Sequence, residues 1–128
     1  MLRAQRHEGR GPSLHLKRQG THPVANAARL LCLEAGWLGE GGTAERLARL
    51  AAGEPTLGAT AREAAVAYGV LADLRLGWQA EQSARGEPLS DRMPIALLGD
   101  TRRRLLLSAY ETVEELRTSV RLRFGLGG

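Results

Sequence analysis

The sequence predicts an all-α domain, a bundle of about four helices with two long antiparallel ones and an extended N-terminal arm. Leucine and alanine, both strong helix formers, supply most of the apolar residues, and no β-branched or aromatic run alternates with a period of two. Two long stretches, 60–83 and 100–124, carry apolar residues at three- and four-residue steps. A chain of 128 residues has the length of one domain.

The first 20 residues are expected to form an arm or a short strand. Met1–Ser13 is polar, basic and rich in glycine, without an apolar core of its own. Leu14–Gly20 alternates briefly between apolar and polar residues, as a short edge strand or extended chain would. We therefore expect an arm over residues 1–20, the bundle over 21–125 and a tail over 126–128.

The first two helices are expected to be short. Pro23 suits the first position of a helix, where its missing N–H does no harm, so a helix is expected over Val24–Ala35. Thr43 is a suitable N-cap for a second helix over residues 43–52.

Three residues near the end of the first helix are expected to belong to the core. Cys32 is the only cysteine, which excludes a disulfide framework and a cysteine-based zinc or redox site. Its position between two leucines favours a buried small side chain over a nucleophile. Trp37 and Leu38 are expected to fold back on the core.

The third helix is expected from Thr60, with Glu63 completing a capping box, to about residues 83–86. One side carries its larger apolar residues: Ala64, Ala67, Leu71, Leu74 and Trp78. The opposite side carries mostly small ones and is a candidate docking face: Ala65, Gly69, Ala72 and Leu76. Because glycine costs about 1 kcal/mol relative to alanine inside a helix, Gly69 suggests close packing against a neighbour.

A loop and a final long helix complete the predicted bundle. Pro88 and Pro94 interrupt residues 87–99, where a loop is expected. Residues 100–124 carry a stripe as regular as that of the third helix: Leu106, Ala109, Val113, Leu116 and Val120. Two long striped helices are expected to pack nearly antiparallel.

The formal charge is +4, and all but one of the 18 basic residues are arginine. This composition fits either a solvated, arginine-biased surface or affinity for phosphates, nucleotides or an acidic partner. Acidic residues are interspersed from Glu34 onwards, and aromatic residues are few, which disfavours nucleic acid. No catalytic motif, acid–base pair or metal-ligand cluster is visible, so no enzyme activity is expected from the chain on its own.

Four arginines are ambiguous. Arg102, Arg103 and Arg104 occupy the first turn of the last helix, where positive charge opposes the helix dipole. Either Asp100 offsets them and they are solvated, or one or more faces an anionic partner. Arg75, at the edge of the apolar stripe, can extend to solvent, pair with a carboxylate of the bundle or point into a binding cleft.

Four segments, in this order and at these separations, resemble one family: LHLKRQGTHPVANAARLLCLEAG, TAERLARL, AYGVLADLRLGWQ and TRRRLLLSAYETVEELRTSVRLRF. It is the nucleotidyltransferase substrate-binding domain found at the C-terminal end of bacterial proteins with cyclic-nucleotide-binding or CBS-pair modules. The resemblance covers about residues 14–124. Positions that match the family pattern are Lys17, Arg29, Arg46, Arg75, Gln79, Arg103 and Phe124, whereas His15 stands where the family usually has aspartate.

The resemblance implies a helical bundle that packs beside a catalytic domain similar to that of protein-PII uridylyltransferase and helps to form its cleft. The candidate ligand-binding residues are Lys17, Arg29, Arg46, Arg75, Gln79, Arg102 and Arg103. A nucleoside triphosphate with magnesium is expected when a catalytic domain is present, with no intrinsic cofactor or metal. Since this chain lacks the catalytic domain, it looks like a separated C-terminal domain whose catalytic partner acts in trans.

Three hypotheses follow for function. The first is a non-catalytic substrate- or nucleotide-binding domain of a nucleotidyltransferase signalling system. The second is a structural or interaction module that forms a homo-oligomer, namely a homodimer through the small-residue face, and binds no nucleotide. The third, disfavoured, is a basic helical nucleic-acid-binding protein. No stretch approaches a signal peptide or the ~20 apolar residues of a membrane span, so a cytoplasmic protein is expected.

Overall fold

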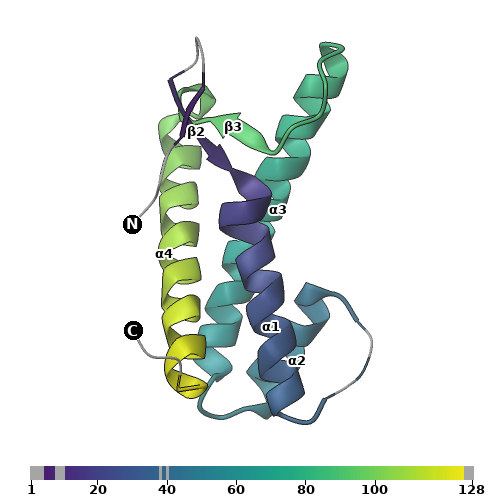
Figure 1. Cartoon of the computed structure of the whole chain (residues 1–128), viewed down its shortest axis with the longest axis vertical. Helices are drawn as coiled ribbons and strands as arrows, with labels where there is room; N and C mark the ends of the chain where they lie inside the picture. Colours follow the sequence, from purple (N-terminus) through teal and green to yellow (C-terminus); the bar gives the residue numbers. More distant parts are fainter. Residues whose placement is uncertain (1–4, 8–10, 38, 40, 126–128) are drawn as a thin grey trace.

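The structure is a computed structural model that describes residues 5–7, 11–37, 39 and 41–125 (Figure 1). In this part of the chain the α-helices are α1 (His22–Glu34), α2 (Thr43–Gly53), α3 (Gly58–Ala84) and α4 (Asp100–Arg123). The strands are β1 (Gln5–His7), β2 (Gly11–His15) and β3 (Arg92–Pro94). A π-helical turn, η1 (Lys17–Thr21), precedes α1, and a 3₁₀ turn, η2 (Ile95–Leu97), precedes α4. The predicted all-α class is confirmed.

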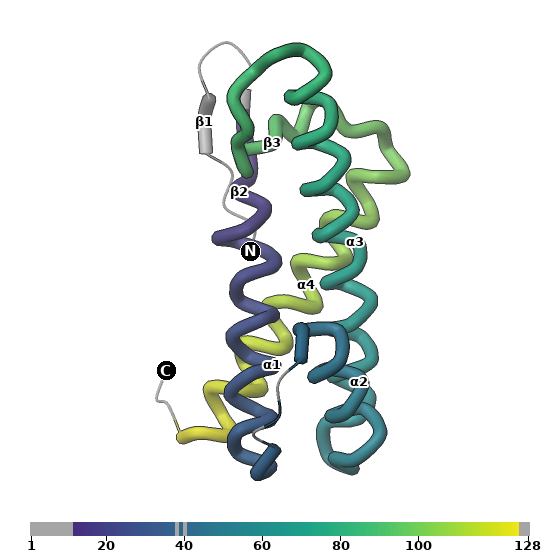
Figure 2. The backbone as a smooth tube through the Cα atoms, turned by 90° about the vertical axis from the view of Figure 1, so that its right-hand side faces the viewer, coloured from purple at the N-terminus to yellow at the C-terminus, as the bar shows by residue number. Residues whose placement is uncertain are grey.

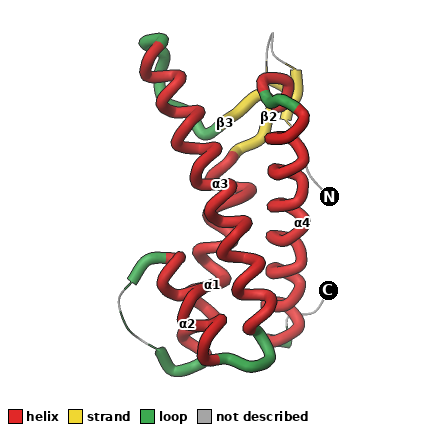
Figure 3. The backbone as a smooth tube through the Cα atoms, turned by 180° about the vertical axis from the view of Figure 1, so that it is seen from behind, coloured by secondary structure: helices red, strands yellow, loops and turns green. Residues whose placement is uncertain are grey.

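The long helices α3 and α4 run antiparallel, side by side, as the sequence predicted (Figures 1 and 2). Helix α1 packs against α4 and α2, and α2 packs against α3. Figure 3 shows α2 at the end of the bundle where α3 begins, with the small sheet at the opposite end. Within the described ranges, no helix combines the length and apolar character that crossing a bilayer requires.

The core forms where the apolar stripes of the helices meet. On α3 the predicted stripe is buried at Ala64, Ala67, Leu71 and Trp78 and half-buried at Leu74. On α4 the stripe is buried from Leu106 to Leu116 at the predicted positions and half-buried at Val120. These residues confirm that three- and four-residue spacing located the buried faces of both long helices.

Two of the three core residues expected near the end of α1 are in contact with the core. Cys32 is buried, and burial raises the pKa of its thiol, which fits a packing residue rather than a nucleophile. Trp37 is half-buried against the core. Leu38 lies outside the described residues.

The N-terminal segment is more closely integrated than expected. Strand β2 pairs antiparallel with β3, with Leu14 opposite Met93, and Leu14 and Leu16 are fully buried. The short edge strand or extended chain expected over Leu14–Gly20 is present only in the first two residues, because Leu16 already has helical backbone angles and residues 17–21 turn into the helix. The expected loop 87–99 likewise contains β3 and η2. Strand β3 has only 3 residues, and Met93 pairs with Leu14 far earlier in the chain, so the sequence carries little local pattern that would reveal this pairing.

Three predicted helix starts were wrong by one or two residues. Helix α3 begins at Gly58 rather than Thr60, and no side chain caps it, so the Thr60 capping box is absent. Buried Leu57 starts the helix instead, since its carbonyl accepts the N–H of Ala61 at 2.8 Å. Gly42, not Thr43, is the N-cap of α2.

The third misplaced start is that of α1, which begins at His22 rather than Val24 because η1 leads directly into it.

One arginine ties together the helix ends at the far end of the bundle. Arg123, the last residue of α4, donates from Nε to Glu34 at the end of α1. Its other nitrogens lie 3.3 Å from Oγ1 of Thr56 and 3.4 Å from Oε2 of Glu54, between α2 and α3. These contacts hold the end of α4 beside α1.

The small-residue face of α3 is only partly covered in the described part of the chain. Ala65 and Ala72 are half-buried, but Leu76 is 70% exposed. A Cβ added at Gly69 would meet no heavy atom within 4 Å. The close packing expected at this glycine is therefore absent from the described chain, and its use for docking stays a prediction.

Gly69→Ala should raise the free energy of unfolding by about 1 kcal/mol, because alanine has the higher helix propensity and its methyl group has room. Urea unfolding measures this change. Gly53→Ala is the matched control: its added Cβ would lie 2.9 Å from Cη2 of Trp37, so the gain there should be smaller or reversed. Loss of stability in Gly69→Ala would show that something covers this position.

Candidate functional site

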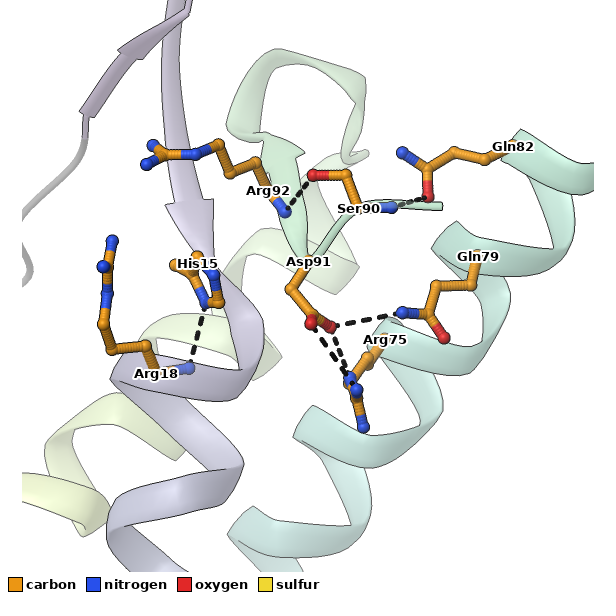
Figure 4. A network of polar contacts seen from close by, with 8 residues as sticks. All are labelled: His15, Arg18, Arg75, Gln79, Gln82, Ser90, Asp91 and Arg92. Atoms are coloured by element: carbon orange, nitrogen blue, oxygen red, sulfur yellow. Dashed lines mark hydrogen bonds and ion pairs between the residues drawn. The ribbon is translucent and has the colours of Figure 1, made fainter. Parts of the chain in front are cut away.

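A polar cluster joins α3 to the small sheet, and Asp91 is at its centre (Figure 4). The Asp91 carboxylate accepts hydrogen bonds from Nε of Arg75 and, at 3.3 Å, from Nε2 of Gln79. Its backbone carbonyl accepts the N–H of Leu16 at 2.8 Å. Of the three roles open to Arg75, the structure shows the ion pair with a carboxylate.

Hydrogen bonds continue from this cluster on both sides (Figure 4). Buried Gln82 accepts the N–H of Ser90 at 3.0 Å and so fastens the α3–β3 connection to the helix. On the other side, Nδ1 of His15 accepts the N–H of Arg18 at 3.0 Å, and Gln19 accepts the N–H of His15 at 2.8 Å. These hydrogen bonds join α3 to residues 90 and 91 and, through the Leu16 N–H, to the start of η1, so the cluster acts as a brace between α3, β3 and η1.

A second polar feature is a groove between α1 and α4 with a volume of about 320 Å³. Two facing pairs of cationic or titratable side chains line it, Arg18 with His22 and Arg117 with Arg121. The remaining lining residues are Pro23, Asn26, Ala27, Leu30 and Val120. No carboxylate is among the lining residues.

The groove's arginines are available for an external anion. Arg117 lies 3.8 Å from Glu114, but both side chains are about half exposed, so this pair is weak. In the described part of the chain, no ion pair or hydrogen bond engages the guanidinium of Arg18 or Arg121. Guanidinium groups bind phosphate through paired hydrogen bonds. The groove therefore suits a phosphate-bearing ligand.

Two of the predicted ligand-binding residues lie near this groove. Lys17 is exposed in η1, next to Arg18. Arg29 is exposed on α1 and donates at 2.8 Å to Oδ1 of Asn26, which lines the groove. Neither lines the groove itself.

The other predicted ligand-binding residues lie elsewhere. Arg75 and Gln79 belong to the Asp91 brace. Arg46 is half-buried on α2, and its carbonyl lies 3.7 Å from the Cys32 thiol. Arg103 donates to the Leu98 carbonyl at 3.5 Å.

Arg102, the last of the set, lines a separate pocket between α3 and α4. The structure thus does not bring the predicted set together into one site.

The four cationic or titratable residues of the groove were not among the site residues predicted from the sequence. A signal was present, because Arg18 and His22, and Arg117 and Arg121, are each four residues apart and so share a helix face. Only the packing of α1 against α4 reveals that the two pairs face each other. Among the described residues, no group of three or more His, Cys, Asp or Glu side chains could hold a metal ion.

Asp91→Asn should lower the free energy of unfolding by about 1–2 kcal/mol, because it removes the charge that Arg75 and Gln79 share. Urea unfolding measures the loss. Arg85→Gln provides the control: Arg85 and Glu81 are 3.4 Å apart and half exposed. Arg85→Gln should change the free energy of unfolding by no more than about 0.5 kcal/mol. Equal effects at the two sites would contradict the brace.

His15 should make the protein less stable as the pH falls. Burial, followed by the positive charge of Arg18, lowers the pKa of His15 below 6.5, and Asp91 acts in the opposite direction. Below about pH 6.5 the unfolded chain therefore binds more protons at this residue than the folded protein, so its contribution to stability is lost there and is complete at higher pH. His15→Asn keeps an acceptor without titrating.

The measurement is the free energy of unfolding at pH 7.5 and pH 5.5. The wild type should lose more stability between them than His15→Asn does. An identical loss in the two proteins would contradict this role of His15.

Comparison with known proteins assigns the chain to a family. The model of a family described as "putative nucleotidyltransferase substrate binding domain" matches residues 1–124. No curated protein and no solved structure matches the chain. The family match confirms the resemblance carried by the four sequence segments and extends it to the N-terminus. Since it spans nearly the whole sequence, the chain belongs to this family of nucleotidyltransferase substrate-binding domains.

Proposed function

We propose that this chain binds the phosphates of a nucleoside triphosphate in the α1–α4 groove and presents them to a nucleotidyltransferase catalytic domain supplied in trans. The observation that carries the proposal is the convergence of Arg18, His22, Arg117 and Arg121 on one groove without a carboxylate among its lining residues. Membership of a substrate-binding family supports an accessory role rather than a catalytic one.

The groove's chemistry fits a triphosphate in two respects. Arginines on facing helices offer hydrogen-bond donors from both walls, and charge-assisted hydrogen bonds to phosphate are about twice as strong as neutral ones. The apolar floor includes Ala27 and Val120 and offers a surface for the sugar or base. Leu30 is 38% exposed, so this floor remains accessible.

The size of the groove fits a nucleotide site that this chain shares with a second domain. At about 320 Å³ it lies near the lower end of the range of about 300–1,000 Å³ for small-molecule sites. A nucleotide held here would leave part of its surface for a second domain to cover. Magnesium would arrive with the phosphates and complete its coordination with carboxylates of the catalytic domain.

Calorimetric titration with ATP and UTP, each with and without magnesium, tests the proposal. The wild type should bind with a dissociation constant of about micromolar order. The double variant Arg18→Ala/Arg121→Ala should bind at least about tenfold more weakly, because hydrogen bonds to charged groups contribute about 1.5–3 kcal/mol each.

The matched control is Arg62→Ala/Arg104→Ala, which removes the same charge from exposed residues outside the groove. Its affinity should stay close to that of the wild type. If the two double variants lost nucleotide affinity equally, net charge rather than the groove would explain the loss. No binding by the wild type would overturn the proposal for the chain alone.

A further inference from the structure

A second open surface lies between α3 and α4 and shares no lining residue with the α1–α4 groove. It consists of two adjoining cavities of about 300 and 320 Å³, which have Val70 and Leu105 in common and form one trough. Three large apolar side chains of the trough are strongly exposed, Val66 at 70%, Leu97 at 54% and Leu105 at 49%. Contiguous exposed apolar surface of this kind is typical of an interface.

The two walls of the trough carry opposite charge. Glu63, Asp73 and Glu81 lie along the α3 wall, and Arg102 lies on the α4 wall. Val70 and Leu105 line both cavities and so lie opposite each other where the cavities join. Three residues further towards the sheet, α3 reaches Asp73 and the antiparallel α4 reaches Arg102, which places the two at a similar height. Both are exposed, and neither makes an ion pair or side-chain hydrogen bond within the described residues. Each is available to an opposite charge from outside the chain.

We propose that this trough is the interface of a homodimer whose two-fold axis runs along it. Such an axis places α3 of each copy over α4 of the other without changing the height of any residue. Asp73 of one copy then faces Arg102 of the partner copy, and the symmetry repeats the contact. An isologous interface requires this kind of self-complementarity, which is why a second copy fits the trough.

The charges also select the arrangement of the dimer. If α3 instead lay over α3 of the second copy, the acidic residues of the two walls would face each other. Like charges brought together across an interface weaken association. The dimer also leaves the small-residue face of α3, with Gly69 and Leu76, outside the interface, and it is independent of nucleotide binding in the α1–α4 groove.

Charge reversal tests the contact between Asp73 and Arg102. Asp73→Arg and Arg102→Asp should each raise the dimer dissociation constant at least about tenfold, because each homodimer would contain two like-charge contacts. Mixing the two variants in equal amounts should restore dimers. The introduced arginine meets the introduced aspartate at one contact, and the native pair meets at the other. Sedimentation velocity and light scattering measure the assembly.

Three controls keep the test specific. Glu111→Arg and Arg49→Asp make the same charge changes at exposed residues outside the trough and should leave association unchanged, alone or mixed. Leu76→Arg, on the small-residue face, should also leave it unchanged. Circular dichroism establishes that every variant is folded.

Several outcomes would overturn the proposal. They are a wild type that stays monomeric at high concentration, dimers that survive both charge reversals, or variants that fail to associate when mixed. If Leu76→Arg dissociated the dimer while Asp73→Arg left it intact, the interface would lie on the small-residue face instead.

Discussion

The fold depends on a close crossing between the η1 turn and the two long helices. A Cβ at Gly20 would lie 3.2 Å from both terminal methyl groups of Leu71 on α3 and 3.5 Å from the hydroxyl of Tyr110 on α4. Leu71 is fully buried, and Tyr110 nearly so. A residue without a side chain lets the backbone approach α3 and α4 together. This crossing sets where α1 begins and therefore how it lies against α4.

The two candidate binding surfaces lie between helices. The α1–α4 groove exists because α1 enters beside α4 at this crossing, and the contacts of Arg123 hold the two helices together at the other end. The α3–α4 trough lies where Val66, Val70 and Leu105 flank the buried stripes of the two antiparallel helices. Neither surface corresponds to a contiguous motif. The Asp91 brace is the stabilising counterpart, since its polar groups are used within the chain.

Most of the helical architecture was predictable because it depends on local spacing. The buried positions of α3 and α4, the buried Cys32 and the half-buried Trp37 follow from apolar periodicity and from position near a helix end. The helix starts were less predictable, because burial of Leu57 outweighed the capping box that Thr60 could have formed. The pairing of β2 with β3 was missed because it joins residues that are distant in the chain.

The sequence by itself determined the helical class, the inward faces of the long helices and, through four ordered segments, the family. These properties arise from short-range spacing and residue type, which the linear order contains. Tertiary structure decided which polar residues meet. It paired Arg75 with Asp91 and brought Arg18 and His22 to face Arg117 and Arg121. Such contacts depend on which helices become neighbours, and the packing of the whole chain decides that.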